Sequence, residues 1–245
     1  MSYPKTPSDV QAIQQSVAAA EAAMTAVVKY LASNMTPTSE QAKTVLDEVL
    51  TSHNCHSPES RIVASGIKTH EPHYMGEGAI SKGEPIVIDI YPQSKETGFF
   101  ADMTRTVCLG EPASELQAIY NAVTQVHKQC VAQLQPGASC DAIHQSAVDQ
   151  FNSLGYQSTG VGSEFKFSEG FVHSIGHGLG RDVHEEPFFG SDRGNTLQVG
   201  DVVTIEPGLY YKHIGGVRLE DLFVITEHGY QQLTTLPLKL RVQDW

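Results

Sequence analysis

The apolar positions of the first fifty residues recur with the period of an α-helix. Thr6 precedes Pro7, and Asp9 stands three residues after Thr6, which is the residue pattern of a capped helix start. Apolar residues then follow at helical spacing: Val10, Ile13, Val17, Ala20, Met24, Val27 and Leu31. A second apolar stripe predicts another helix from about Thr38 to Leu50. The chain therefore begins with a predicted pair of helices.

The same order of elements occurs twice along the chain. Runs of β-branched and apolar residues predict strands over 61–65, 85–91 and 104–109. Helical spacing then returns over 116–134, which Pro136-Gly137 ends, and over 143–154, which Gly155 closes. Further strands are predicted over 171–173, 201–206 and 217–226. A helix pair followed by antiparallel strands, twice, predicts an α+β fold of two pseudo-equivalent halves, and residues 1–245 are predicted to form a single domain.

Composition and charge limit the partners and the cellular location that we expect for the chain. The net charge of −12 disfavours nucleic acid and anionic membranes as partners, and no apolar stretch approaches the ~18 residues that span a bilayer. The segment Met1–Lys5 lacks the charged and apolar regions of a signal peptide. The four cysteines form no CxxC pair, which argues against a disulfide framework and a thiolate zinc site. We therefore expect a cytoplasmic, soluble protein.

Each half carries two acidic residues in matched positions. Asp89 ends the apolar run Pro85-Ile86-Val87-Ile88 and Asp102 follows it (102 − 89 = 13), while Glu206 ends a similar run and Glu220 follows (220 − 206 = 14). If the halves face each other, four carboxylates converge, and such a concentration of negative charge requires cations. Surface carboxylates at strand ends would explain any one of them alone, and explain the matched set less well.

Histidines supply a neutral ligand beside these acids. The segment "FVHSIGHGLGRDVHEEP" contains His173, His177 and His184 among several glycines, which argue against a helix and let the backbone approach a bulky or charged group. A lone histidine is more often structural than a ligand, but three beside four acids favour a metal site. Imidazole with carboxylates suits manganese, cobalt, iron or zinc, whereas an all-oxygen site would suit calcium or magnesium.

These residues carry a family resemblance that extends from about residue 5 to residue 226. The set resembles the dinuclear metallopeptidases of the pita-bread fold, which are the methionine aminopeptidases, aminopeptidases P and prolidases. The resemblance implies two divalent metal ions per chain, manganese first, with cobalt, zinc or iron as alternatives, and it is consistent with a homodimer. Asp89 would bind one ion, His177 and Glu206 the other, and Asp102 and Glu220 would bridge both.

Further residues resemble the proline-specific branch. "PHYMGEG" contains His73 and "GGVRLED" contains Arg218, and in those relatives the equivalents of His73, His173, His184 and the arginine contact substrate or assist proton transfer. The resemblance implies a peptide substrate with a free N-terminus, whose Xaa-Pro bond is hydrolysed by a hydroxide held between the two ions. Glu206 would accept and return the proton, and His184, with His73, would stabilise the oxyanion.

Two alternatives and two departures accompany this interpretation. In the first alternative, the chain is a methionine aminopeptidase that removes Met before a small residue. In the second, it is a catalytically silent peptide-binding module, since the fold also serves in creatine hydrolysis and chaperone-type roles. Aminopeptidases P and prolidases usually carry an N-terminal domain, which we expect to be absent, so we expect tripeptides and longer peptides to be preferred over dipeptides. The Asp89–Asp102 loop is also longer than usual, with Ile90-Tyr91 where a glycine commonly follows.

Overall fold

The computed structural model describes residues 4–58, 61–159, 168–190 and 192–245. Residues 1–3, on which the expectation about export partly rests, lie outside the described residues. The first helix pair is α1 (Pro7–Ser33) and α2 (Ser39–Ser52). At the start of α1 the Thr6 hydroxyl accepts the Asp9 N–H, and the Asp9 carboxylate accepts the Thr6 N–H, so the predicted capping pattern is confirmed.

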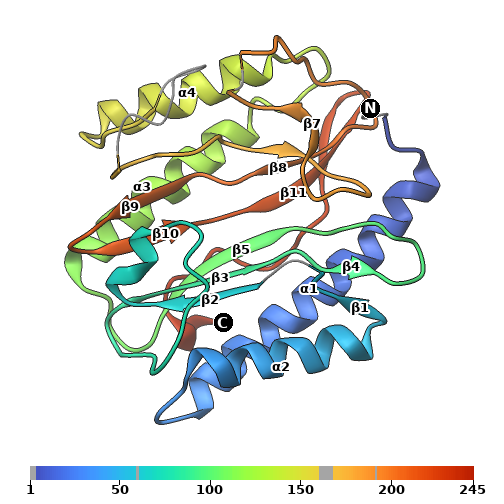
Figure 1. Cartoon of the computed structure of the whole chain (residues 1–245). Helices are drawn as coiled ribbons and strands as arrows, with labels where there is room; N and C mark the ends of the chain where they lie inside the picture. Colours follow the sequence, from blue (N-terminus) through green and yellow to red (C-terminus); the bar gives the residue numbers. More distant parts are fainter. Residues whose placement is uncertain (1–3, 59–60, 160–167, 191) are drawn as a thin grey trace.

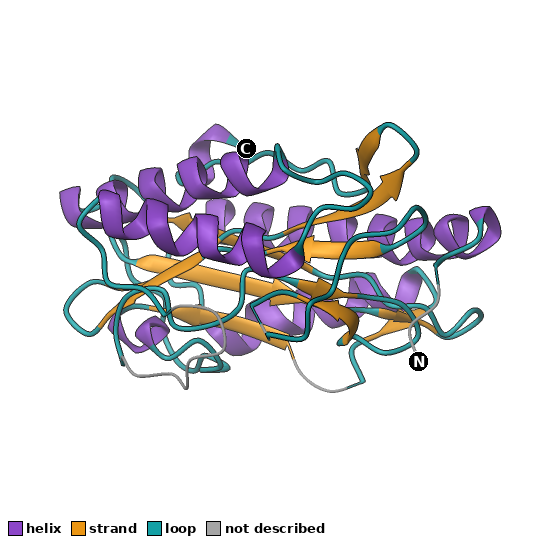
Figure 2. Cartoon of the chain, turned by 90° about the horizontal axis from the view of Figure 1, so that it is seen from above, coloured by secondary structure: helices purple, strands orange, loops and turns teal. Residues whose placement is uncertain are grey.

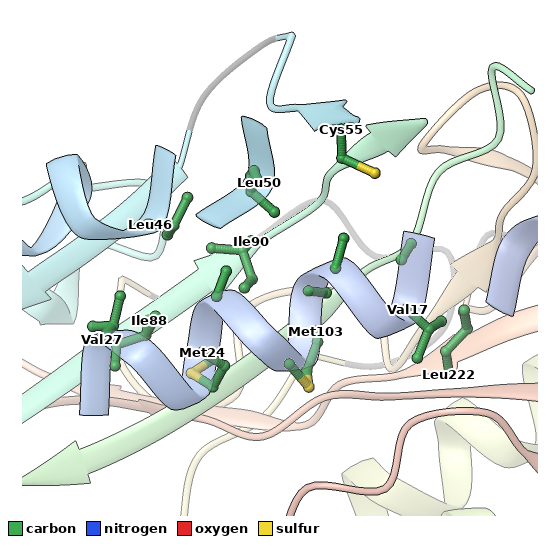
Figure 3. Packing of buried hydrophobic residues seen from close by; sticks show 14 of the residues in the cluster. Val17, Met24, Val27, Leu46, Leu50, Cys55, Ile88, Ile90, Met103 and Leu222 are labelled. Atoms are coloured by element: carbon green, nitrogen blue, oxygen red, sulfur yellow. The ribbon is translucent and has the colours of Figure 1, made fainter. Parts of the chain in front are cut away.

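A three-stranded antiparallel sheet follows this helix pair. Its order is β2 (Arg61–Ser65), β3 (Pro85–Ile90) and β5 (Met103–Cys108). Two short strands, β1 (Cys55–His56) and β4 (Gln93–Ser94), pair with each other, and a 3-10 helix, η1 (Ile67–His70), follows β2. Figure 3 shows the apolar face of α1, including Val17, Met24 and Val27, packed against Ile88 and Ile90 of β3. Burial of these side chains holds the first half together.

The second half repeats the arrangement. Its helices are α3 (Ser114–Val131) and α4 (Cys140–Ser153). Its five-stranded sheet has the order β12 (Gly229–Gln232), β11 (Asp221–Thr226), β8 (Val202–Ile205), β6 (His177–Gly178) and β7 (Glu185–Phe188). A hairpin of β9 (Gly208–Tyr211) and β10 (Gly215–Arg218) and a 3-10 helix, η2 (Val242–Asp244), complete it.

Each half carries its own helix pair. In Figure 1, α4 lies above the strands and α2 below them, α1 runs diagonally behind β3 and β4, and β8 and β11 of the second half face β3 and β5 of the first. Seen from above, most of the helices lie along one side of the strands (Figure 2). The predicted order, a helix pair followed by antiparallel strands in each half, is confirmed.

The predicted strand over 171–173 is wrong. Phe171 takes part in a single bridge with Ser158, and its neighbour Gly170 in another with Tyr210. Phe171 is buried because its ring packs against the rings of Phe151 and His144, with centroid distances of 5.1 Å and 5.5 Å. Ring packing, rather than a strand ladder, therefore explains why this run is apolar.

The predicted strand over 217–226 is divided into two strands. β10 ends at Arg218 and β11 begins at Asp221, so Leu219 and Glu220 lie between them. The Glu220 N–H donates to the Thr104 carbonyl of the first half at 3.0 Å, and the Leu219 N–H donates to the Pro207 carbonyl at 3.3 Å. The backbone turns toward the first half at this point, which places the Glu220 side chain between the two halves.

Candidate metal centre

Four carboxylates from matched places in the two halves line one pocket of about 660 Å³. Asp89 is on β3, Asp102 directly precedes β5, Glu206 directly follows β8, and Glu220 directly precedes β11. The pairing of β3 with β5 brings two of the acids together: Asp89 pairs with Thr104, which lies two residues after Asp102. The convergence of the four acids that the sequence pattern predicts is therefore present in the structure.

His177 lies among these carboxylates on β6. Its Nδ1 is 3.1 Å from the Gly178 carbonyl oxygen, so the Nδ1 proton is donated there and Nε2 presents a lone pair to the pocket. Nε2 is 3.4 Å from Glu206 Oε1 and 3.8 Å from Asp102 Oδ2. A hydrogen bond that fixes the neutral tautomer in this way is typical of a metal-binding histidine.

Glycines on both sides of His177 admit the neighbouring backbone. A Cβ on Gly176 would lie 2.1 Å from the Thr204 carbonyl oxygen, and one on Gly178 would lie 2.4 Å from the Glu186 carbonyl oxygen. Only glycine allows β6 to pack this closely between its neighbours. The backbone does make close approaches at these glycines, but to the backbone of the adjacent strands rather than to the bulky or charged group that we expected.

The electrostatics of the pocket favour protons or cations. Burial, with the neighbouring Glu220 and Asp89, raises the pKa of Asp102 well above its ordinary value. Burial also raises the pKa of Glu206 to about 8, and burial with the nearby Glu206 raises the pKa of Glu220 well above the ordinary value. Burial lowers the pKa of His177 to about 3, so the imidazole is neutral. Clustered carboxylates of this kind must hold protons or bind cations.

The donor atoms fit a divalent metal ion. Asp102, His177 and Glu220, all buried, each offer one ligand atom, and these atoms lie within 4.8 Å of one another. Asp89 Oδ1 and Asp102 Oδ1 are buried without a hydrogen-bond partner, which is costly for a carboxylate oxygen unless a cation satisfies it. Carboxylate oxygen with one imidazole nitrogen is a donor set for manganese, iron, cobalt or zinc.

Arg218 forms an ion pair with one of these acids. Its Nη2 donates to Asp89 Oδ2 at 2.6 Å, and its Nη1 donates to the Tyr210 hydroxyl at 2.7 Å. The Arg218 side chain is buried, and its Nε also faces the Thr104 hydroxyl at 3.4 Å. These donors orient Asp89 and Thr104. The predicted contact of Arg218 with substrate stays a prediction.

Tyr210 is a site residue that the sequence pattern did not reveal. Its hydroxyl accepts from Arg218 and lies 2.9 Å from His173 Nε2, to which it donates. His173 Nδ1 lies 2.7 Å from the Ser174 carbonyl, so both ring nitrogens of His173 have partners within the protein. His173 lines the pocket, and a contact with substrate would therefore use the face of its ring.

His73 and His184 lie at the rim of the same pocket. Both side chains are exposed, and both line the pocket together with the metal-ligand candidates. The His184 ring lies 4.4 Å from the His177 ring, centroid to centroid, at an interplanar angle of 72°. The structure therefore brings the predicted catalytic histidines to the mouth of the carboxylate pocket, as the resemblance implies.

Comparison with known proteins identifies the family of this chain. The sequence matches Metallopeptidase family M24 over residues 11–227. The chain belongs to this family. An uncharacterised peptidase of Bacillus subtilis is 36% identical over 180 residues, which is 73% of this chain and 47% of that protein. The Xaa-Pro dipeptidase of Pyrococcus furiosus is 29% identical over 232 residues, 94% of this chain and 62% of the relative. The chain thus spans about half to two thirds of the length of these M24 relatives.

Solved structures of M24 proteins resemble the whole described fold. The prolidase of Pyrococcus horikoshii superposes with a TM-score of 0.85 at 28% identity, over 97% of this chain and 65% of that one. The Xaa-Pro dipeptidase of Bacillus anthracis superposes with a TM-score of 0.86 at 29% identity, over 97% and 63%. The predicted α+β pita-bread fold is therefore confirmed. None of the described helices combines the length and apolar character needed to cross a membrane.

Proposed function

We propose that this chain is a metal-dependent exopeptidase that hydrolyses the N-terminal Xaa-Pro bond of a peptide. The observation that carries the proposal is the pocket in which four carboxylates and the Nε2 lone pair of His177 converge beneath two exposed histidines. Membership of family M24 supports a peptidase, and the relatives named Xaa-Pro dipeptidase support the preference for proline. The single domain, the cytoplasmic location and the homodimer stay predictions.

The ligand assignment is the one that the family resemblance implies. Asp89 would hold one of two divalent ions, His177 and Glu206 would hold the other, and Asp102 and Glu220 would hold both. Bound ions would neutralise the carboxylates and polarise a peptide carbonyl and a water molecule. Manganese is our first expectation, because the set is mostly carboxylate oxygen with one imidazole nitrogen.

The protein's own groups supply proton transfer. Glu206 lies at the pocket wall beside His177, so its carboxylate would accept a proton from the attacking water and return it to the leaving nitrogen of proline. His184, with His73, would stabilise the negative charge that develops on the carbonyl oxygen. Because the nitrogen of proline in an Xaa-Pro bond carries no hydrogen, the site needs no acceptor for it.

Apolar residues on both sides of the pocket would contact the substrate side chains. Ile62, Met75 and Tyr91 come from the first half, and Val172 and Phe188 come from the second. Such walls suit the proline ring and an apolar residue before it, because each buried methylene contributes about 0.8 kcal/mol to binding. They offer no charged partner for a charged side chain.

Initial rates on three peptides test the proposal. The chelator-stripped protein is reloaded with Mn²⁺ and assayed on Ala-Pro-Ala, Ala-Pro and Met-Ala-Ser under one condition. We expect cleavage after alanine in the proline peptides, with Met-Ala-Ser much slower, and the ratio of Ala-Pro-Ala to Ala-Pro measures the preferred length. Fastest turnover of Met-Ala-Ser would make the chain a methionine aminopeptidase. Absence of turnover with metal bound would favour a silent peptide-binding module.

A further inference from the structure

The turn between β6 and β7 carries His184 to the rim of the pocket. His184 is the last residue before β7, and its exposed ring stands edge-on to that of the candidate metal ligand His177. The ring is exposed and contacts the His177 ring, and the backbone of residues 179–185 carries it to this place.

A buried lysine from the beginning of the chain holds one end of this turn. Lys5 is 7% exposed, and its ammonium forms an ion pair with Glu185, the residue directly after His184. The Lys5 N–H donates to the Gly200 carbonyl at 2.7 Å, which fixes the backbone of Lys5 just before β8. In Figure 1 the segment just before α1 lies near β7. A buried ammonium without a partner is strongly unfavourable, and the Glu185 carboxylate supplies an ion-pair partner for Lys5 at this place.

Glu185 is held at the same place by its backbone. It pairs with Gly178 across β6 and β7, and Gly178 directly follows His177. A Cβ on Gly180 would lie 2.7 Å from both carboxylate oxygens of Glu185, so the missing side chain at Gly180 leaves room for that carboxylate. The ion pair with Lys5 thus fixes Glu185 directly beside the backbone that carries His177.

The other end of the turn is attached to the loop between β4 and β5. The Phe100 N–H donates to the Gly180 carbonyl at 2.9 Å, and Arg181 Nη1 donates to the Thr97 carbonyl at 2.9 Å. The Arg181 guanidinium also lies 4.7 Å from the centre of the Phe99 ring. The longer Asp89–Asp102 loop therefore contacts the turn that carries His184.

We propose that Lys5 is a positioning residue for His184: its ion pair with Glu185 fixes the backbone that places the His184 ring at the pocket rim. The proposal rests on the proposed role of His184 in hydrolysis. Lys5 itself does not line the pocket. Its effect would therefore pass through the backbone beside Glu185, and retention of bound metal in Lys5→Met would distinguish an effect through His184 from one through His177.

A double-mutant cycle tests this coupling. Lys5→Met should lower kcat for Ala-Pro-Ala by roughly 10-fold with KM within about twofold, because a small displacement of a group that acts in the transition state lowers kcat. In a His184→Ala background, Lys5→Met should change kcat by less than about twofold. Lys239→Met, which removes the exposed contact of the Lys239 ammonium with the Asp244 carbonyl oxygen away from the pocket, is the matched control and should leave kcat unchanged. An equal loss in both backgrounds, or no loss in either, overturns the proposal.

A second variant and a second readout keep the test independent of folding and of activity. Gly180→Ala should displace the Glu185 carboxylate without removing a charge, and should reproduce the loss of kcat. In ¹H–¹³C spectra of the metal-free protein, the imidazole signal that His184→Ala removes should shift or split in Lys5→Met and Gly180→Ala. An unaltered His184 signal in Gly180→Ala overturns the proposal even if Lys5→Met does not fold. If the wild type cleaves no peptide, a changed signal supports the positioning role and the proposed function alone fails.

Discussion

The pocket carboxylates predict that the metal-free protein becomes less stable as the pH rises from 7 to 8. Burial raises the pKa of Glu206 to about 8, above its ordinary value of 4.5. The folded protein therefore keeps the Glu206 proton through a pH range in which the unfolded chain has lost it. Stability from this group is complete below about pH 4.5 and is lost as the pH rises through 8.

Histidine acts in the opposite direction but outside this window. Burial lowers the pKa of His177 to about 3, so the folded protein leaves the imidazole neutral while the unfolded chain binds a proton below 6.5. That contribution to stability is present above 6.5 and is lost as the pH falls toward 3. Between pH 7 and 8 the carboxylate contribution therefore dominates.

The magnitude follows from one proton. A group that binds one more proton in the folded state costs about 1.4 kcal/mol of stability per pH unit, and partial titration of Glu206 near its pKa reduces this to about 1 kcal/mol between pH 7 and 8. For a chain of this length that corresponds to a fall in Tm of about 2–4 °C. Asp102 and Glu220, whose pKa values are also raised, add to the fall in the same direction.

Thermal unfolding of chelator-stripped protein at pH 7.0, 7.5 and 8.0, at constant ionic strength, measures this dependence. Glu206→Gln should show a smaller fall in Tm, because it lacks the titrating group. Mn²⁺ competes with these protons, so the increase in Tm on adding Mn²⁺ should grow with pH. A Tm of the stripped wild type that is constant or rises from pH 7 to 8 would refute the reasoning, as would an equal slope in Glu206→Gln.

Three further predictions concern single residues. Asp102→Ala or Glu220→Ala should abolish hydrolysis and reduce the bound metal measured by elemental analysis, because each removes a ligand proposed to hold both ions; unchanged metal content would count against bridging. His184→Ala should lower kcat by roughly 10²-fold with metal content retained, whereas His177→Ala should lose metal, so identical behaviour of the two variants would show that the roles are misassigned. Tyr210→Phe removes the hydroxyl that joins Arg218 to His173 and should lower the free energy of unfolding by about 1–3 kcal/mol, measured by urea denaturation, and a loss below about 0.5 kcal/mol would contradict the network.

The elements and ligands that could be predicted from the sequence have strong local signals. The helix that begins at Pro7 has both a capping pattern and a long apolar stripe, and the structure places it as predicted. Asp89 and Glu206 close apolar runs, where an acid is conspicuous, Asp102 and Glu220 follow them at matched separations, and His177 lies in a glycine-rich run of histidines. All five line one pocket. In these cases a pattern of a few neighbouring residues was enough to predict the helix or the candidate ligand.

The elements that could not be predicted depend on long-range contacts. Tyr210 lies in an apolar run, and its hydroxyl partners Arg218 and His173 come from other segments, so its role has no local signal. Lys5 is 180 residues from Glu185 in sequence. Phe171 is apolar because it packs against aromatic rings, which a hydrophobic pattern does not distinguish from a strand.

The presence of a catalytic metal centre is tested most directly by titrating metal and activity together. Chelator-stripped protein is reloaded with increasing Mn²⁺, and bound metal per chain and the initial rate on Ala-Pro-Ala are measured on the same samples. Five candidate ligand residues around one pocket predict about two ions per chain at saturation, a rate that rises with occupancy, and no rate in the stripped protein. Two results would contradict a metal centre at Asp89, Asp102, His177, Glu206 and Glu220. One is full hydrolysis by the stripped protein, and the other is a folded chain that binds no metal at any Mn²⁺ concentration.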